Sequence, residues 1–188
     1  MASATEIAKR YFAALNAHDL DQATALWAPD AVDRFVGVQE VVGPEGVREY
    51  FSNLFAAFPD FTLEVLDCTT SRQRTAVRWR ARGTFAGPGT FQGFEANGAQ
   101  IDLEGCDVLT VSEDLIRHND AYVDSGSLAQ QLGFLPPAGS RAQERMTRLA
   151  NLRTRLRTRL SAGRPERVAE RVWVIRGGFP VRTMNVYL

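Results

Sequence analysis

The segment from Leu115 to Asp124 concentrates side chains that can move protons. Its sequence, LIRHNDAYVD, alternates so that Ile116, His118 and Asp120 are expected on one face of a strand. A His and an Asp at positions i and i+2 are neighbours on that face, close enough to act on the same bound molecule. We therefore predict an acid/base site that includes His118 and Asp120.

A second carboxylate lies in the preceding strand-like segment, residues 99–111. Asp107 shares its predicted face with apolar side chains such as Leu103 and Leu109. A carboxylate in such surroundings needs a hydrogen-bond partner or a raised pKa. Asp107 is therefore predicted to belong to the same site, although it has an alternative role in bonding a backbone N–H or Tyr11 and holding the sheet together.

The elements that must position these groups follow from the periodicity of apolar residues. A helical period covers residues 4–28, with a break at 16–19, and a third helix is predicted from Pro44 until shortly before Phe58. A short strand is expected at 31–38. Alternation with period two then predicts four strands, at 61–68, 75–85, 99–111 and 115–124. This order predicts an α+β fold with three N-terminal helices on one face of a curved antiparallel sheet.

Charge divides the chain into two parts. Residues 1–139 hold 10 basic and 19 acidic side chains, a net charge of −9, and residues 140–188 hold 12 and 3, a net charge of +9. Such a basic tail favours docking onto an acidic surface or a solvated face over a nucleic-acid partner. No segment reaches the ~20 apolar residues of a membrane span, and no signal-peptide pattern is present, so we expect a cytoplasmic protein without a membrane partner.

Three parts are predicted along the chain: a domain at 1–137, a basic amphipathic helix or linker at 138–163, and a short extension at 164–188. Ser140 is a candidate cap for the helix. Residues 171–188 weakly resemble the first strands of metallo-β-lactamase-fold hydrolases, but the His-x-His-x-Asp-His motif of that family is absent. The extension is therefore expected to be a truncated second domain or a degenerate remnant. Cys68 and Cys106 lack metal-ligand spacing, so no metal site is predicted.

Three further segments together resemble one known superfamily. They are KRYFAALNAHDLDQATALWAPDAV in the first helical pair, AAFPDF at 56–61, and the last strand running into AQQLG at 129–133. Over about residues 4–135 the chain resembles the SnoaL-like polyketide cyclases of the nuclear-transport-factor-2-like superfamily. The resemblance implies a cone-shaped sheet with an apolar pocket, and a homodimer.

The cyclase resemblance also implies a mechanism. These enzymes close a ring by an intramolecular aldol reaction, with one Asp as acid/base on the last strand near a His in a His-x-Asp arrangement. His118-Asn119-Asp120 resembles that arrangement, offset by one residue relative to the downstream QLG. The resemblance implies Asp120 as the base and no cofactor, because hydrogen-bond donors stabilise the enolate.

Two other enzyme groups of the superfamily match less well. Tyr11 and Asp107 resemble the oxyanion hole of ketosteroid isomerases, but the position of their base is Phe35, with Asp33 two residues earlier on the same face. Limonene-type epoxide hydrolases place an Arg where this chain has Gly105. The missing groups argue against both activities.

We therefore expect a cofactor-independent polyketide cyclase or isomerase-like enzyme that acts on a small, apolar, carbonyl-bearing substrate. Asp120 and His118 are the predicted acid/base pair, and Tyr11 with Asp107 is the predicted oxyanion site. The side chains expected to contact the substrate are Trp27, Asp33, Phe35, Phe51, Phe55, Trp79, Leu103 and Tyr122. The alternative is a non-catalytic module that binds a small ligand or serves regulation.

Overall fold

The computed structural model describes residues 2–161, 166–169, 172–175 and 184–187, and it describes side-chain burial as far as residue 155. The chain divides into two compact units, Met1–Leu135 and Pro136–Leu188. All residues of the predicted site lie in the first unit. Each unit is described by itself.

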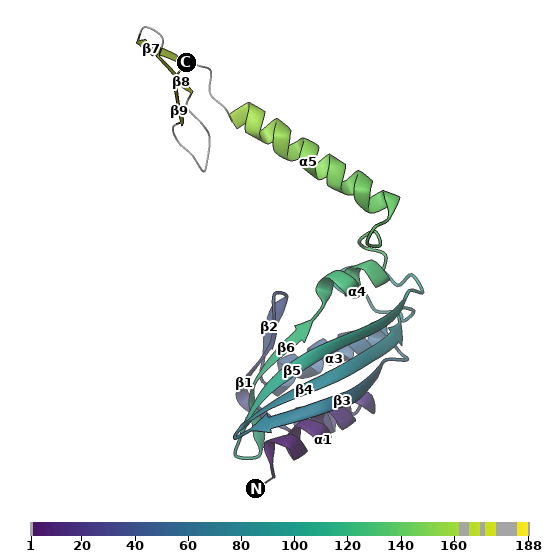
Figure 1. The fold of residues 1–188 in the computed structure, drawn as a ribbon. Helices are drawn as coiled ribbons and strands as arrows, with labels where there is room; N and C mark the ends of the chain where they lie inside the picture. Colours follow the sequence, from purple (N-terminus) through teal and green to yellow (C-terminus); the bar gives the residue numbers. More distant parts are fainter. Residues whose placement is uncertain (1, 162–165, 170–171, 176–183, 188) are drawn as a thin grey trace. The chain divides into compact units, whose positions relative to one another are not determined.

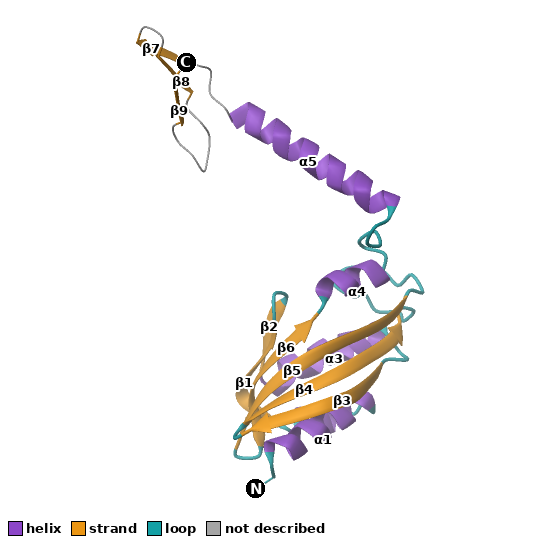
Figure 2. Ribbon diagram, viewed as in Figure 1, coloured by secondary structure: helices purple, strands orange, loops and turns teal. Residues whose placement is uncertain are grey.

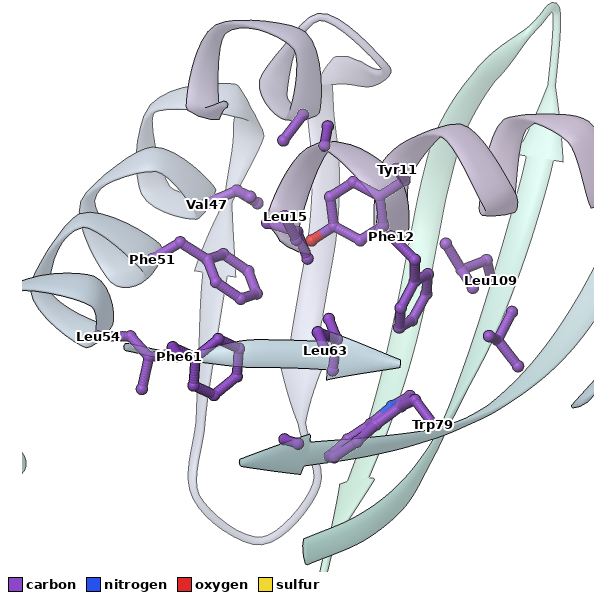
Figure 3. Close-up of a cluster of buried hydrophobic side chains, with 14 of the residues drawn as sticks. Tyr11, Phe12, Leu15, Val47, Phe51, Leu54, Phe61, Leu63, Trp79 and Leu109 are labelled. Carbon is purple, nitrogen blue, oxygen red and sulfur yellow. The ribbon is translucent and has the colours of Figure 1, made fainter. Parts of the chain in front are cut away.

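Three helices lie in the first half of this unit: α1 (Ala4–Asn16), the short α2 (Leu20–Thr24) and α3 (Gly43–Ala57). α1 begins with a capping box, because the Ser3 hydroxyl accepts from the Glu6 N–H and the Glu6 carboxylate accepts from the Ser3 N–H. α3 has Pro44 in its first turn, as predicted. The apolar faces of α1 and α3 pack against the sheet, where their side chains meet those of the strands (Figure 3).

The sheet has six strands in the order β2-β1-β6-β5-β4-β3 (Figure 1). They are β1 (Trp27–Phe35), β2 (Gln39–Val42), β3 (Thr62–Ser71), β4 (Arg74–Thr84), β5 (Gln100–Ser112) and β6 (Leu115–Val123). The predicted α+β class, with N-terminal helices on a curved sheet, is confirmed (Figure 2). One feature differs from the prediction: β1 pairs with β6 in parallel, so the sheet is mixed.

A β-bulge in β6 decides which side chains face the helices. On β5, Val111 pairs with Ile116, and Thr110, the residue before Val111, pairs with His118. Arg117 therefore has no partner on β5 and is an extra residue in β6. The bulge reverses the alternation for the rest of β6. The prediction that Ile116, His118 and Asp120 share one face is therefore wrong, because Ile116 lies on the helix-facing side and the other two lie on the opposite side.

Gly105 is required by a close approach between two strands. It pairs with Trp79 across β4 and β5, and the indole ring lies directly over it. A Cβ at position 105 would clash with Cζ2 and Cη2 of the Trp79 ring. The glycine thus allows the indole to reach the next inward-facing side chain of β5, which is Asp107.

The second unit contains α5 (Arg141–Ser161), followed by β7 (Glu166–Ala169), β8 (Val172–Ile175) and β9 (Met184–Tyr187). Ser140 caps α5, because its hydroxyl accepts from the Gln143 N–H at 3.1 Å. The three strands form an antiparallel sheet in the order β7-β8-β9. The Gly-Gly-Phe-Pro sequence at 177–180 lies outside the described residues.

No helix in the described part of the chain has the length and apolar character needed to cross a membrane.

We predict that Gly105→Ala destabilises the protein by about 1–3 kcal/mol, because the new methyl group must displace the Trp79 ring in a packed core. The matched control is Gly83→Ala on β4, where a Cβ would lie 3.4 Å from its nearest neighbours, an ordinary contact. Urea unfolding of both variants measures the difference. Equal unfolding midpoints for the two variants would show that the contact of the Trp79 ring with residue 105 does not require glycine there.

Candidate functional site

An apolar cavity of about 90 Å³ lies between the sheet and helices α1 and α3. Its wall is mostly aromatic and aliphatic, and the carboxylates among its described lining residues are Asp33 of β1 and Asp107 of β5. Both are almost fully buried, with 1% and 7% of their surfaces exposed. A cavity of this kind, with a few convergent polar groups, is typical of a small-molecule site.

Asn119 of β6 connects the two carboxylates. Its Nδ2 donates to Asp33 Oδ1 at 3.0 Å and to Asp107 Oδ2 at 2.7 Å. Asp107 accepts a further hydrogen bond from Trp79 Nε1 at 2.8 Å. The arrangement follows from the sheet order, since β6 lies between β1 and β5 and all three side chains are on the cavity face.

Burial raises the pKa of both carboxylates. Desolvation raises the pKa of Asp107 to about 6, although hydrogen bonds from Trp79 and Asn119 oppose the increase. The pKa of Asp33 is raised well above its usual range, first by desolvation and then by the nearby charge of Asp107. Asp33 therefore holds its proton to a higher pH than Asp107 does. A base and an acid with separated pKa values thus face the same cavity.

Tyr50 of α3 is an aromatic residue of the cavity wall that was not predicted as part of the site. Its ring stacks on Phe35 with centroids 4.0 Å apart. Burial is the main cause that raises its pKa, and the charges of Asp33 and Asp107 add to it. Tyr50 therefore stays neutral and keeps its hydroxyl proton near the two carboxylates.

The predicted acid/base pair lies away from this cavity. Asp120 Oδ1 accepts from Arg34 Nε at 2.7 Å and lies 3.0 Å from His118 Nε2, and none of the three lines the cavity. Arg34 and His118 are 43% and 40% exposed at their side chains. The hydrogen bond from Arg34 is the main reason that the pKa of Asp120 is lowered, so its carboxylate is a weaker base than a free aspartate.

Tyr11 lies in the core beside the site. Its ring packs edge-on against Trp27, with centroids 5.5 Å apart, and neither side chain lines the cavity. The Tyr11 hydroxyl and Trp27 Nε1 are both buried without a hydrogen-bond partner among the described residues. Desolvation, followed by the charges of Asp33 and Asp107, raises the pKa of Tyr11.

The structure divides the predicted substrate contacts into two groups. Those that line the cavity are Asp33, Phe35, Phe51, Trp79 and Leu103. Three others do not, because Trp27 packs on Tyr11, Phe55 stacks on His18 at 4.0 Å, and Tyr122 lies on the opposite face of the sheet with 47% of its surface exposed.

Asn119 was missed because its position depends on the bulge. One sequence signal could have revealed it: β6 contains the apolar residues Ile116, Ala121 and Val123, and the odd spacing between the first two requires one extra residue if all three face inward. With that correction, Asn119 becomes the inward-facing neighbour of Ala121.

The described residues contain no group of three or more His, Cys, Asp or Glu side chains placed to hold a metal ion.

The sequence and the fold were compared with known proteins. The family model of the SnoaL-like polyketide cyclases matches residues 5–132. The chain belongs to this family. It is also similar to the solved structure of IdmH from Streptomyces antibioticus, with 25% identity, a TM-score of 0.61, and coverage of 70% of this chain and 99% of IdmH.

Two further solved structures show the same fold. AclR from Streptomyces galilaeus is 23% identical, with a TM-score of 0.63 and coverage of 82% of this chain and 96% of AclR. An LEH-like epoxide hydrolase from M. tuberculosis is 14% identical, with a TM-score of 0.57 and coverage of 70% and 90%. No curated protein matches the sequence. The resemblance of 171–188 to metallo-β-lactamase-fold hydrolases has no support in these comparisons.

We predict that the stability cost of ionising Asp107 appears between pH 4 and 7. Its pKa is about 3.9 in the unfolded chain and about 6 when folded, so the protonated form stabilises the fold below pH 4 and this contribution is lost as the pH rises through about 6. Asp107→Asn should therefore gain stability relative to the parent protein over this range, by up to about 3 kcal/mol.

Urea unfolding from pH 4 to 8 measures this gain. Asp102→Asn is the matched control on the same strand, because hydrogen bonds from Arg80 lower the pKa of Asp102 to about 2. Its contribution is complete above the unfolded pKa, so its difference from the parent protein should be constant above pH 5. A constant difference for Asp107→Asn as well would contradict the raised pKa.

Proposed function

We propose that this member of the SnoaL-like family catalyses a cyclase- or isomerase-type proton transfer on a small, apolar, carbonyl-bearing substrate. The observation that carries the proposal is the pair of buried carboxylates, Asp33 and Asp107, joined by Asn119 beside an apolar cavity. Family membership supports the reaction class. The cavity supports a substrate that is mostly apolar.

In the proposed mechanism the ionised Asp107 removes a proton from the carbon next to the substrate carbonyl. The electron pair of that C–H bond moves into the carbonyl to form an enolate, and the protonated Asp33 donates a hydrogen bond to the enolate oxygen. In an isomerisation, the proton on Asp107 returns to another carbon. In a cyclisation, the enolate carbon attacks a second carbonyl of the same molecule, and Asp33 gives its proton to the resulting alkoxide. The proton held by Asp107 then passes to Asp33, which restores the starting state of the pair.

The assignment of the base to Asp107 replaces Asp120 for a geometric reason. Asp107 lines the cavity and has a raised pKa, whereas Asp120 lies on the other face of the sheet in an ion pair with Arg34. A base must reach the proton that it removes. The proton-exchange experiment described next also tests the predicted role of Asp120 and His118.

We predict that the full chain accelerates the exchange of the α-protons of 2-tetralone in D₂O, measured by ¹H NMR. Asp107→Asn should reduce the rate at least ~100-fold, because the base is lost. Asp120→Asn is the matched control and should leave the rate within about threefold of the parent protein, a change too small for loss of a general base. Normal exchange in Asp107→Asn with loss in Asp120→Asn would return the role to Asp120.

The pH profile adds a second criterion. Activity should rise as Asp107 ionises near pH 6 and fall at higher pH as Asp33 loses its proton, because the reaction needs one member of the pair in each state. A rate without the rise near pH 6 would exclude Asp107 as the base.

The alternative function is a non-catalytic module that binds a small ligand in the same cavity. It predicts that 2-tetralone stabilises the protein against heat without any exchange of its α-protons.

A further inference from the structure

A groove of about 590 Å³ adjoins the cavity. It lies between β2 with its preceding turn, one face of α3, and residues 89–92. The groove and the cavity share three lining residues, Tyr50, Leu54 and Phe91, so these side chains border both spaces. We propose that one elongated substrate occupies both, with its carbonyl-bearing apolar head in the cavity and an uncharged, hydrogen-bonding tail in the groove. This inference rests on the proposed function.

The sizes of the two spaces support a substrate in two parts. The cavity, at about 90 Å³, accommodates only a small head group, whereas the groove is several times larger. Tyr50 and Leu54 are one helical turn apart on α3, and Phe91 packs into the core with 9% of its surface exposed. In the proposal, a molecule with its reactive carbon beside Asp107 reaches the groove past these three residues.

The chemistry of the groove indicates the kind of tail. Its walls combine valine side chains of β2 with amides, a hydroxyl and one carboxylate. The polar residues among those that line it are Gln39, Glu49, Asn53, Thr90 and Gln92. None of the described lining residues is basic, so an anionic tail would meet Glu49 without a compensating cation. Amide and hydroxyl groups donate and accept hydrogen bonds, which suits hydroxyl or amide groups on the tail.

The groove is formed in advance of binding, because its loop wall is bonded to α3. Gly87 N donates to Ala57 O at 3.0 Å, and Phe91 and Phe94 exchange two backbone hydrogen bonds of 3.0 and 2.9 Å. A Cβ at Gly87 would clash with the Ala56 carbonyl oxygen, so glycine is needed for this contact. A preformed wall reduces the entropy that is lost when a ligand binds.

Calorimetric titration of the full chain with two probes tests the proposal. The first is 2-naphthol, a planar enol mimic that represents the head alone, and the second is 2-naphthol with a 3-hydroxypropyl chain on its far ring. The second probe should bind at least about tenfold more tightly, because its chain gains apolar and hydrogen-bond contacts in the groove. Asn53→Trp fills the groove and should remove this gain while changing the affinity for 2-naphthol by less than about twofold.

The matched control is Ser52→Trp. Ser52 is an exposed neighbour on α3 that does not line the groove, so this variant should keep the full gain. Equal affinities of the two probes for the parent protein would overturn the proposal. So would equal effects of the two tryptophan substitutions on the longer probe.

A third probe with a carboxyethyl chain tests the charge. It should bind more weakly than the hydroxypropyl probe, by about threefold or more, and Glu49→Gln should reduce this difference. Tighter binding of the carboxylate probe would overturn the assignment of an uncharged tail. Because these are binding measurements, a failure of 2-tetralone exchange would reject the proposed reaction and leave the groove result intact, and the reverse also holds.

Discussion

The burial of two carboxylates beside one apolar cavity is the constraint that the rest of the first unit satisfies. Each carboxylate loses most of its hydration, and the sheet replaces that hydration with only three hydrogen bonds, two from Asn119 and one from Trp79. This incomplete compensation keeps the pKa values high. The mixed topology makes the arrangement possible, because β6 must lie between β1 and β5 for one amide to reach both groups.

The pKa values of carboxylates are shifted in opposite directions on the two faces of the sheet. On the outer face, Asp120 and Asp102 form ion pairs with Arg34 and Arg80, and the pKa values of both carboxylates are lowered. The Arg80–Asp102 pair, exposed on both sides, stabilises the fold only weakly because solvent screens it. On the inner face no arginine lines the cavity among the described residues, and burial dominates. A proton can therefore be held and released at the inner face near neutral pH, whereas the outer carboxylates stay ionised.

The sequence predicted the fold class and the family well, because both depend on long periodic segments and on extended motifs. The inward face of β5 also followed correctly from its alternation, as the buried Ile101, Leu103 and Leu109 show. Prediction failed for β6 beyond Arg117, since a bulge is determined by pairing with the neighbouring strand and not by local alternation. The helix α3 was predicted, but which of its aromatic residues meets the cavity depends on packing, so Tyr50 was missed while Phe55, which stacks on His18, was included.

The bulge at Arg117 has a consequence for how this site can diversify. Two sets of side chains alternate along β6, with His118 and Asp120 in one and Asn119 and Ala121 in the other, and a single extra residue selects the set that faces the cavity. Loss of the bulge, with Arg117 taken into the regular alternation, would shift the residues that follow by one position and exchange the two sets at once, bringing His118 and Asp120 to the cavity face and Asn119 to the opposite face. The strand thus carries two alternative cavity-facing surfaces in one sequence, separated by the presence or absence of one bulge and not by a series of point substitutions.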